Sequence, residues 1–211
     1  MLPLALGEAG LPVHPLLAEA LAAAAARNAY PPVAGLPELR EAAAGYWTRR
    51  GLPTSAGAVI CGPGSKPLPF AVLLALGADV AVPKPSWDSY AAQATLAGAR
   101  PHFVPTPPGE GGICDPAALA RAVTAAKAAG RRIGSAIVTL PDNPTGRLAQ
   151  PATVRALCEV AARHDLVIIS DEIYRDLVYD TVPPAGGTAP DSAVLPSPAV
   201  FAPSAPWSPP R

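Results

Sequence analysis

The sequence predicts an α/β fold of three layers, in which helices cover both faces of a mainly parallel sheet. From about residue 58 onward, short β-branched or apolar runs alternate with amphipathic helical stretches, which is the pattern of consecutive βαβ units. Half of the 211 residues are apolar, enough to bury one sizeable core. We therefore expect one α/β domain with additional segments at its ends.

Five strands are expected in the sheet, because five short apolar runs are bounded by turn residues. They cover residues 58–61, 79–82, 100–104, 135–140 and 166–170.

Helices with recognisable ends lie between and before these strands. Asp115 and Pro116 supply an N-cap and a first-turn proline for one helix, and Gly130 ends it,. Further helices are expected over residues 16–26, 37–50 and 151–164.

A change of composition after residue 180 separates a tail (181–211) from the rest of the chain, in which we expect an N-terminal segment (1–30) and an α/β region (31–180). The tail contains nine of the 29 prolines, no lysine and one acidic residue, without apolar periodicity. Such a segment cannot bury enough apolar surface to offset its ordering entropy, so we expect it to be disordered. Out-of-frame reading of GC-rich DNA gives this composition, and so does a natural linker.

Charge and cysteine content narrow the class of protein. Sixteen basic and sixteen acidic side chains give a formal net charge of zero, so no uniform field would attract nucleic acid or an anionic membrane. The longest uncharged run, residues 67–78, is too short to span a bilayer,. Cys61, Cys114 and Cys158 are odd in number and widely spaced, which indicates free thiols rather than disulfides or a metal site. We therefore expect a cytoplasmic protein without bound metal.

A glycine-rich turn at residues 61–66, CGPGSK, lies between a predicted strand and a predicted helix. Backbone amides of Gly64, Ser65 and Lys66 at a helix start form a typical phosphate site. The spacing matches neither a P-loop nor a dinucleotide-binding fingerprint. An ordinary Gly-Pro turn is the alternative interpretation.

Residues 85–90, PSWDSY, follow another predicted strand. Trp87 would offer a flat aromatic face to a ring-shaped ligand, or would anchor the next helix in the core.

Two further loops carry a hydrogen-bonding amide and a carboxylate. In PDNPTG, residues 141–146, a rigid turn exposes Asn143, although Asn-Pro-x-Gly also occurs in ordinary turns,. In SDEIYR, residues 170–175, Asp171 leaves an apolar strand and must pair with a cation or hydrogen-bond well,. A protonated pyridine nitrogen is such a cation, and a helix N-cap is the alternative role.

All four loops follow the carboxyl ends of predicted strands, where open α/β sheets bind ligands. Together they offer a phosphate cradle, a ring stacker, an amide and a carboxylate, which complement a phosphorylated, phenolic pyridine.

The order of these motifs resembles that of the class I/II aminotransferases, the fold-type I enzymes that use pyridoxal 5'-phosphate. The resemblance is carried by NPTG at 143–146, SDEIY at 170–174 and the block YPPVAGLPELREAAAGYW at 30–47. It covers residues 4–180 and implies transfer of an amino group between an amino acid and a 2-oxo acid.

The resemblance also assigns roles to the residues that would hold the cofactor. Gly64, Ser65 and Lys66 would bind its phosphate, and Trp87 would stack on the pyridine ring. Asp171 would pair with the pyridinium nitrogen.

Three further roles follow from the same resemblance. Asn143 and Tyr174 would hydrogen-bond the phenolic oxygen. Tyr30 would reach the phosphate of a neighbouring subunit, which implies a homodimer.

The family's Schiff-base lysine lies beyond the SDEIY motif, and Lys66, Lys84 and Lys127 are the three lysines of this chain. None stands at that position, so no catalytic residue is assigned and we expect a truncated chain that is inactive alone. The resemblance also implies that the sheet lacks two strands between residues 58–61 and the others. The alternatives are a non-catalytic binding or dimerisation partner of a full-length relative, and a fragment of a lyase or decarboxylase with the same fold.

Overall fold

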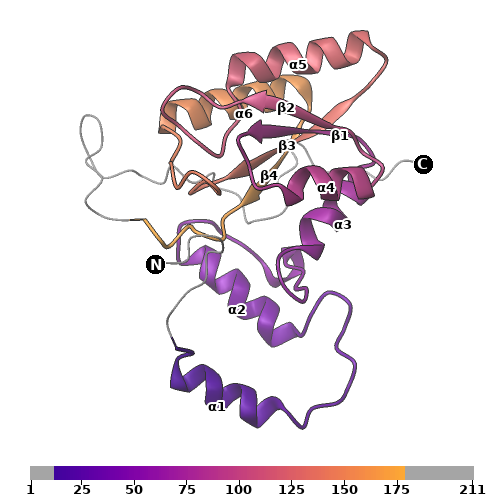
Figure 1. The fold of residues 1–211 in the computed structure, drawn as a ribbon. Helices are drawn as coiled ribbons and strands as arrows, with labels where there is room; N and C mark the ends of the chain where they lie inside the picture. Colours follow the sequence, from indigo (N-terminus) through magenta and orange to yellow (C-terminus); the bar gives the residue numbers. More distant parts are fainter. Residues whose placement is uncertain (1–11, 179–211) are drawn as a thin grey trace, which may run out of the picture. The chain divides into compact units, whose positions relative to one another are not determined.

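The computed structural model describes residues 12–178, which form two compact units, one ending at Val33 and the other beginning at Ala34. Figure 1 shows both units with their helices and strands labelled. The first contains helix α1, Pro15–Ala24, in agreement with the helix expected there. The expected disordered tail, residues 181–211, lies outside the described residues.

The second unit is built on four parallel strands. Their order across the sheet is β2-β1-β3-β4. The bounds are Asp79–Lys84 for β1, Pro101–Pro105 for β2, Ile133–Thr139 for β3 and Val167–Asp171 for β4. Four of the five predicted strands are thus confirmed.

The prediction of a strand at residues 58–61 is wrong. A 3₁₀ helix, η1, occupies Ala56–Ala58, and Val59 is extended without belonging to a strand. Its backbone groups bond elsewhere: the Val59 carbonyl accepts from Arg40 Nε at 2.8 Å, and the Cys61 amide donates to the Ala34 carbonyl at 2.9 Å. An apolar run becomes a strand only when a neighbouring strand pairs with it, and none of the four described strands does so,.

Three helices of the second unit, α2, α5 and α6, begin where the sequence predicts. Asp115 caps α5, its Oδ1 accepting the Ala118 amide at 2.7 Å. Gly77, at φ 55°, ends α3 in the left-handed region that glycine adopts easily,. The bounds are Pro37–Thr48 for α2, Pro67–Leu76 for α3, Ser89–Leu96 for α4, Pro116–Ala128 for α5 and Pro151–His164 for α6.

These helices cover both faces of the sheet, which confirms the three-layer architecture. In Figure 1, α5 and α6 lie on one side of the strands and α3 and α4 on the other. Side chains alternate accordingly along β1: Val80 and Val82 pack in the cluster with α3 and α4, and Ala81 packs in the cluster with α5 and α6,. The ligand-binding edge expected from the sequence is the one where all four strands end.

The opposite, amino edge of the sheet is fixed by a buried carboxylate. Arg131 donates to both oxygens of Asp79 at 2.6 Å, His102 Nε2 lies 2.8 Å from Oδ2, and the Arg100 amide donates to Oδ1 at 3.0 Å. The hydrogen bonds from Arg131, then those from His102 and Arg100, hold the pKa of the Asp79 carboxyl well below its usual range. One side chain thereby ties β1 to the starts of β2 and β3.

We expect Asp79→Asn to lower the free energy of unfolding at pH 7 by about 2 kcal/mol, because a buried hydrogen-bonded charge is lost. A carboxyl whose folded pKa is depressed stabilises the fold above its unfolded value, about 3.9, and ceases to do so as the pH falls below that value. The stability difference from the unaltered chain should therefore shrink between about pH 4 and pH 2. Urea unfolding at several pH values measures this, with Asp88→Asn, an exposed position, as the control. A difference that stays constant down to pH 2 would contradict the ion pair.

Candidate cofactor site

Asp171, the last residue of β4, presents a carboxylate at the carboxyl edge of the sheet. Its Oδ2 accepts a hydrogen bond from the Tyr90 hydroxyl at 2.8 Å, and its Oδ1 accepts the Ile173 amide at 3.2 Å. No α-helix begins in the described segment after β4, which ends at residue 178, so the alternative role of Asp171 as a helix N-cap is wrong. Two different segments therefore fix the orientation of this carboxylate.

Tyr90, on α4, was not singled out from the sequence. It is 1% exposed, and its hydroxyl lies 2.8 Å from Thr139 Oγ1 at the end of β3 as well as from Asp171. Burial, and then the negative charge of Asp171, raise the pKa of Tyr90, so its hydroxyl keeps its proton. The sequence could have indicated Tyr90 by its spacing, because residues three apart in a helical turn lie on the same side, and Tyr90 comes three residues after Trp87.

Trp87 lies just before α4 and is half-buried, so it is neither a fully buried core anchor nor a free surface residue. Its ring meets the Tyr90 ring edge-to-face, with centroids 5.3 Å apart and an interplanar angle of 87°. The Lys66 Nζ lies 5.5 Å from the centroid of the Trp87 ring. The predicted ring stacker and the predicted phosphate turn are therefore neighbours.

The glycine-rich turn precedes α3, as the sequence predicts, but it does not follow a strand. Gly64, Ser65 and Lys66 are exposed, and Gly64 adopts φ +86°, which favours glycine,. The Lys66 carbonyl accepts a hydrogen bond from Gln93 Nε2 at 2.9 Å. A hydrogen bond from α4 thus holds the turn, whereas the strand predicted before it at residues 58–61 is not formed.

Ser65 and Asp171 line the same cavity, which has a volume of about 330 Å³. This is within the usual size range of small-molecule sites. Its wall includes apolar side chains of α3, β3 and β4 and two aromatic side chains of α2, among them Leu68, Val72, Ile137, Ile169, Tyr46 and Trp47.

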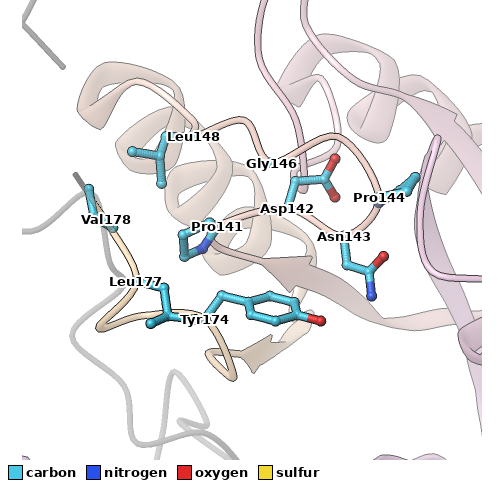
Figure 2. A pocket seen from close by; sticks show the side chains of 9 residues that line it. All are labelled: Pro141, Asp142, Asn143, Pro144, Gly146, Leu148, Tyr174, Leu177 and Val178. Carbon is cyan, nitrogen blue, oxygen red and sulfur yellow. The ribbon is translucent and has the colours of Figure 1, made fainter. Parts of the chain in front are cut away.

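Asn143 and Tyr174 line a second cavity, of about 360 Å³. Figure 2 shows the Tyr174 ring directed toward the side of this cavity where Asn143 lies, with Leu148, Leu177 and Val178 on the other side. The structure thus groups four predicted residues in two pairs, each in its own cavity. Tyr30 belongs to the first unit, so no described geometry relates it to either pair.

The turn that carries Tyr174 is fastened to helix α2. The Tyr46 hydroxyl donates to Asp176 Oδ2 at 2.7 Å, and Arg50 Nη2 donates to the same oxygen at 3.0 Å. The segment after β4 is therefore anchored to the C-terminal part of α2.

The end of β3 is enclosed by glycines of the loop after β2. Gly112 adopts φ +71°, and a Cβ there would lie 1.8 Å from the Thr139 carbonyl oxygen. In the same contact the Thr139 amide donates to the Gly112 carbonyl at 2.8 Å. Only glycine allows this approach, which positions Thr139 beside Tyr90.

We expect Gly112→Ala to destabilise the fold by more than about 3 kcal/mol, since it adds a backbone clash to left-handed strain. Gly109→Ala is the matched control, because Gly109 has a similar φ of +80° with no atom within 4 Å of an added Cβ. Its cost should be only about 1–2 kcal/mol of strain. Urea unfolding of both variants tests this, and equal losses would contradict the close approach.

Within residues 12–178, no three His, Cys, Asp or Glu side chains are grouped as a metal ion requires. Over the same range, no helix is both long and apolar enough to cross a membrane.

The three-layer fold with its parallel sheet is that of the large domain of the fold-type I aminotransferases. The sequence matches the model of the family "Aminotransferase class I and II" over residues 4–196. The chain belongs to this family, as the motif order predicts.

Similar proteins bear the same family name. The chain is 37% identical to the probable aspartate/prephenate aminotransferase of Thermus aquaticus, covering 87% of this chain and 48% of that protein. It is 36% identical to the aspartate/prephenate aminotransferase of Thermus thermophilus, covering 80% and 43%. The chain spans about half the length of the curated relatives it matches.

Solved structures agree with the fold. A Thermus thermophilus aspartate aminotransferase mutant superposes with a TM-score of 0.71 at 35% identity, covering 82% of this chain and 48% of that one. The aspartate aminotransferase of Rhizobium meliloti gives 0.74 at 26% identity, covering 83% and 44%.

Proposed function

We propose that this chain binds pyridoxal 5'-phosphate and contributes the pyridine- and phosphate-binding part of an aminotransferase, which transfers an amino group between an amino acid and a 2-oxo acid. The observation that carries the proposal is the Asp171 carboxylate, which shares a cavity with Ser65 in a chain of the aminotransferase family.

The hydrogen bonds of Asp171 leave room for a cationic ligand. Both described partners, the Tyr90 hydroxyl and the Ile173 amide, are neutral donors. A carboxylate has about four acceptor sites, so it can also accept a pyridinium N–H. Because its negative charge is not neutralised by these partners, it favours the protonated form of a nearby pyridine. A protonated ring is what makes the bound cofactor an electron sink.

The other proposed contacts come from residues in or beside the cavity of Asp171 and from the second cavity. Gly64, Ser65 and Lys66 hold the phosphate at the start of α3, where backbone amides and helix dipole favour an anion. Trp87, beside Lys66, stacks on the ring.

Asn143 and Tyr174 bind the phenolic oxygen from the turns after β3 and β4. The homodimer, in which Tyr30 approaches the phosphate of the other subunit, belongs to the same proposal and is supported by the resemblance at residues 30–47. We also propose a cytoplasmic location, supported by the three free cysteines,.

We propose that none of the three lysines forms a covalent bond to the cofactor beside Asp171. Lys84 ends β1, two strand spacings from β4, which is roughly 10 Å. Lys127 is in the last turn of α5, which packs on the other face of the sheet. Lys66 belongs to the phosphate turn.

We expect Asp171→Asn to weaken binding of pyridoxal phosphate to the chain at least about tenfold, because the charge opposite the pyridinium is lost. Asp88→Asn, at the exposed N-cap of α4 without a side-chain hydrogen bond, should leave binding unchanged. Equilibrium dialysis measures both. Equal affinities of the two variants, or no binding by the unaltered chain, would refute the proposed site.

A second expected outcome concerns covalent attachment. After incubation with pyridoxal phosphate, borohydride reduction and peptide mapping, no lysine should carry a stoichiometric adduct. A full equivalent on Lys66, Lys84 or Lys127 would show that this chain supplies its own lysine.

A further inference from the structure

A series of hydrogen bonds runs from Thr139 through Tyr90 to Asp171, and the last two of these residues line the cavity of the proposed site. Resting on the proposed function, we propose that Tyr90 is a positioning residue: its hydroxyl orients the Asp171 carboxylate toward a protonated pyridine nitrogen, and its ring contacts the stacking side chain Trp87.

The direction of the two hydrogen bonds follows from the groups. A carboxylate only accepts, so the single Tyr90 proton goes to Asp171 Oδ2,. The Tyr90 oxygen then accepts the proton of the Thr139 hydroxyl, 2.8 Å away. In this arrangement the hydroxyl protons of Thr139 and Tyr90 both have an acceptor, and Asp171 Oδ2 has a donor.

Because Tyr90 and Thr139 are buried, water cannot easily take the place of either hydroxyl group in these hydrogen bonds. Tyr90 and Thr139 are each 1% exposed, so water cannot substitute for a lost partner without a rearrangement. Removing the Tyr90 hydroxyl would leave both the Asp171 oxygen and the Thr139 hydroxyl without their partner, and such unmade bonds are costly.

Tyr90 also fixes the distance between two parts of the site. Its hydroxyl bonds Asp171 on β4, and its ring meets the Trp87 ring edge-to-face at 5.3 Å. A flat ligand held between a stacking face and a carboxylate needs both at a constant separation. One rigid side chain on α4 sets that separation.

The donor is neutral, which matters for the charge of the site. An Arg or Lys in this place would neutralise Asp171, whereas a tyrosine holds the carboxylate and leaves its negative charge for the ligand. The Tyr90 hydroxyl would thus act, through Asp171, on the nitrogen of the pyridine and not on the rest of the ring.

The test compares two ligands on the full chain: pyridoxal phosphate, and the analogue in which a carbon replaces the ring nitrogen. Tyr90→Phe should raise the dissociation constant of pyridoxal phosphate about tenfold, as expected for a lost hydrogen bond to a charged group. It should leave that of the analogue unchanged. In an Asp171→Asn background, Tyr90→Phe should change neither constant, because the carboxylate through which it acts is absent.

Thr139→Val provides a second variant, which keeps the side-chain shape and removes only the distal hydroxyl. It should show the same selectivity for the nitrogen-containing ligand with a smaller effect, about threefold. If Tyr90→Phe does not fold, this variant alone decides the matter.

Equal weakening of both ligands, or no weakening of either, would show a purely structural role and overturn the inference. The proposed function would then still stand on the effect of Asp171→Asn. Failure of the unaltered chain to bind pyridoxal phosphate would refute the proposed function and this inference together.

Discussion

The hydrogen bond between Tyr90 and Asp171 is the interaction on which the site depends. An apolar strand that ends in a carboxylate needs a donor for it, since an unpartnered buried carboxylate is costly. The donor comes from α4, 81 residues earlier in the chain, and this requires α4 to lie on the same face of the sheet as that carboxylate. The packing of α3 and α4 on this face, with Ile137 and Ile169 between helices and strands, is what brings the donor there.

Two aspartates, the buried Asp79 and the partly buried Asp171, have opposite roles at the two edges of the sheet. Asp79 is neutralised by the bidentate Arg131 and also hydrogen-bonded to His102, so its charge is compensated within the fold. Asp171 is held by neutral groups among the described residues. The hydrogen bonds of Asp79 stabilise the fold, whereas those of Asp171 leave its negative charge available to a cationic ligand.

Much of the architecture could be predicted because its signals are local. Alternating apolar runs and helix ends such as Asp115 and Gly130 identified four strands and the main helices. The error at residues 58–61 has a non-local cause, since a strand exists only by pairing and no described strand pairs there.

Tyr90 and Thr139 were missed for the same reason. The Tyr90 hydroxyl bonds Asp171, 81 residues away, and Thr139, 49 residues away, and only packing reveals these contacts. Loop order indicated which residues face the sheet edge, but not that Asn143 and Tyr174 line one cavity and Ser65 and Asp171 another.

The central claim is that the charge of Asp171 is reserved for a pyridine nitrogen, and the protonation state of that nitrogen tests it most directly. Pyridoxal phosphate labelled with nitrogen-15 in the ring can be bound to the full chain and followed by NMR at a pH where the free cofactor has lost its ring proton. The account predicts the signal of a protonated nitrogen with the unaltered chain, and that of an unprotonated nitrogen with Asp171→Asn. An unprotonated nitrogen in the unaltered chain, or a protonated one in both proteins, would contradict it.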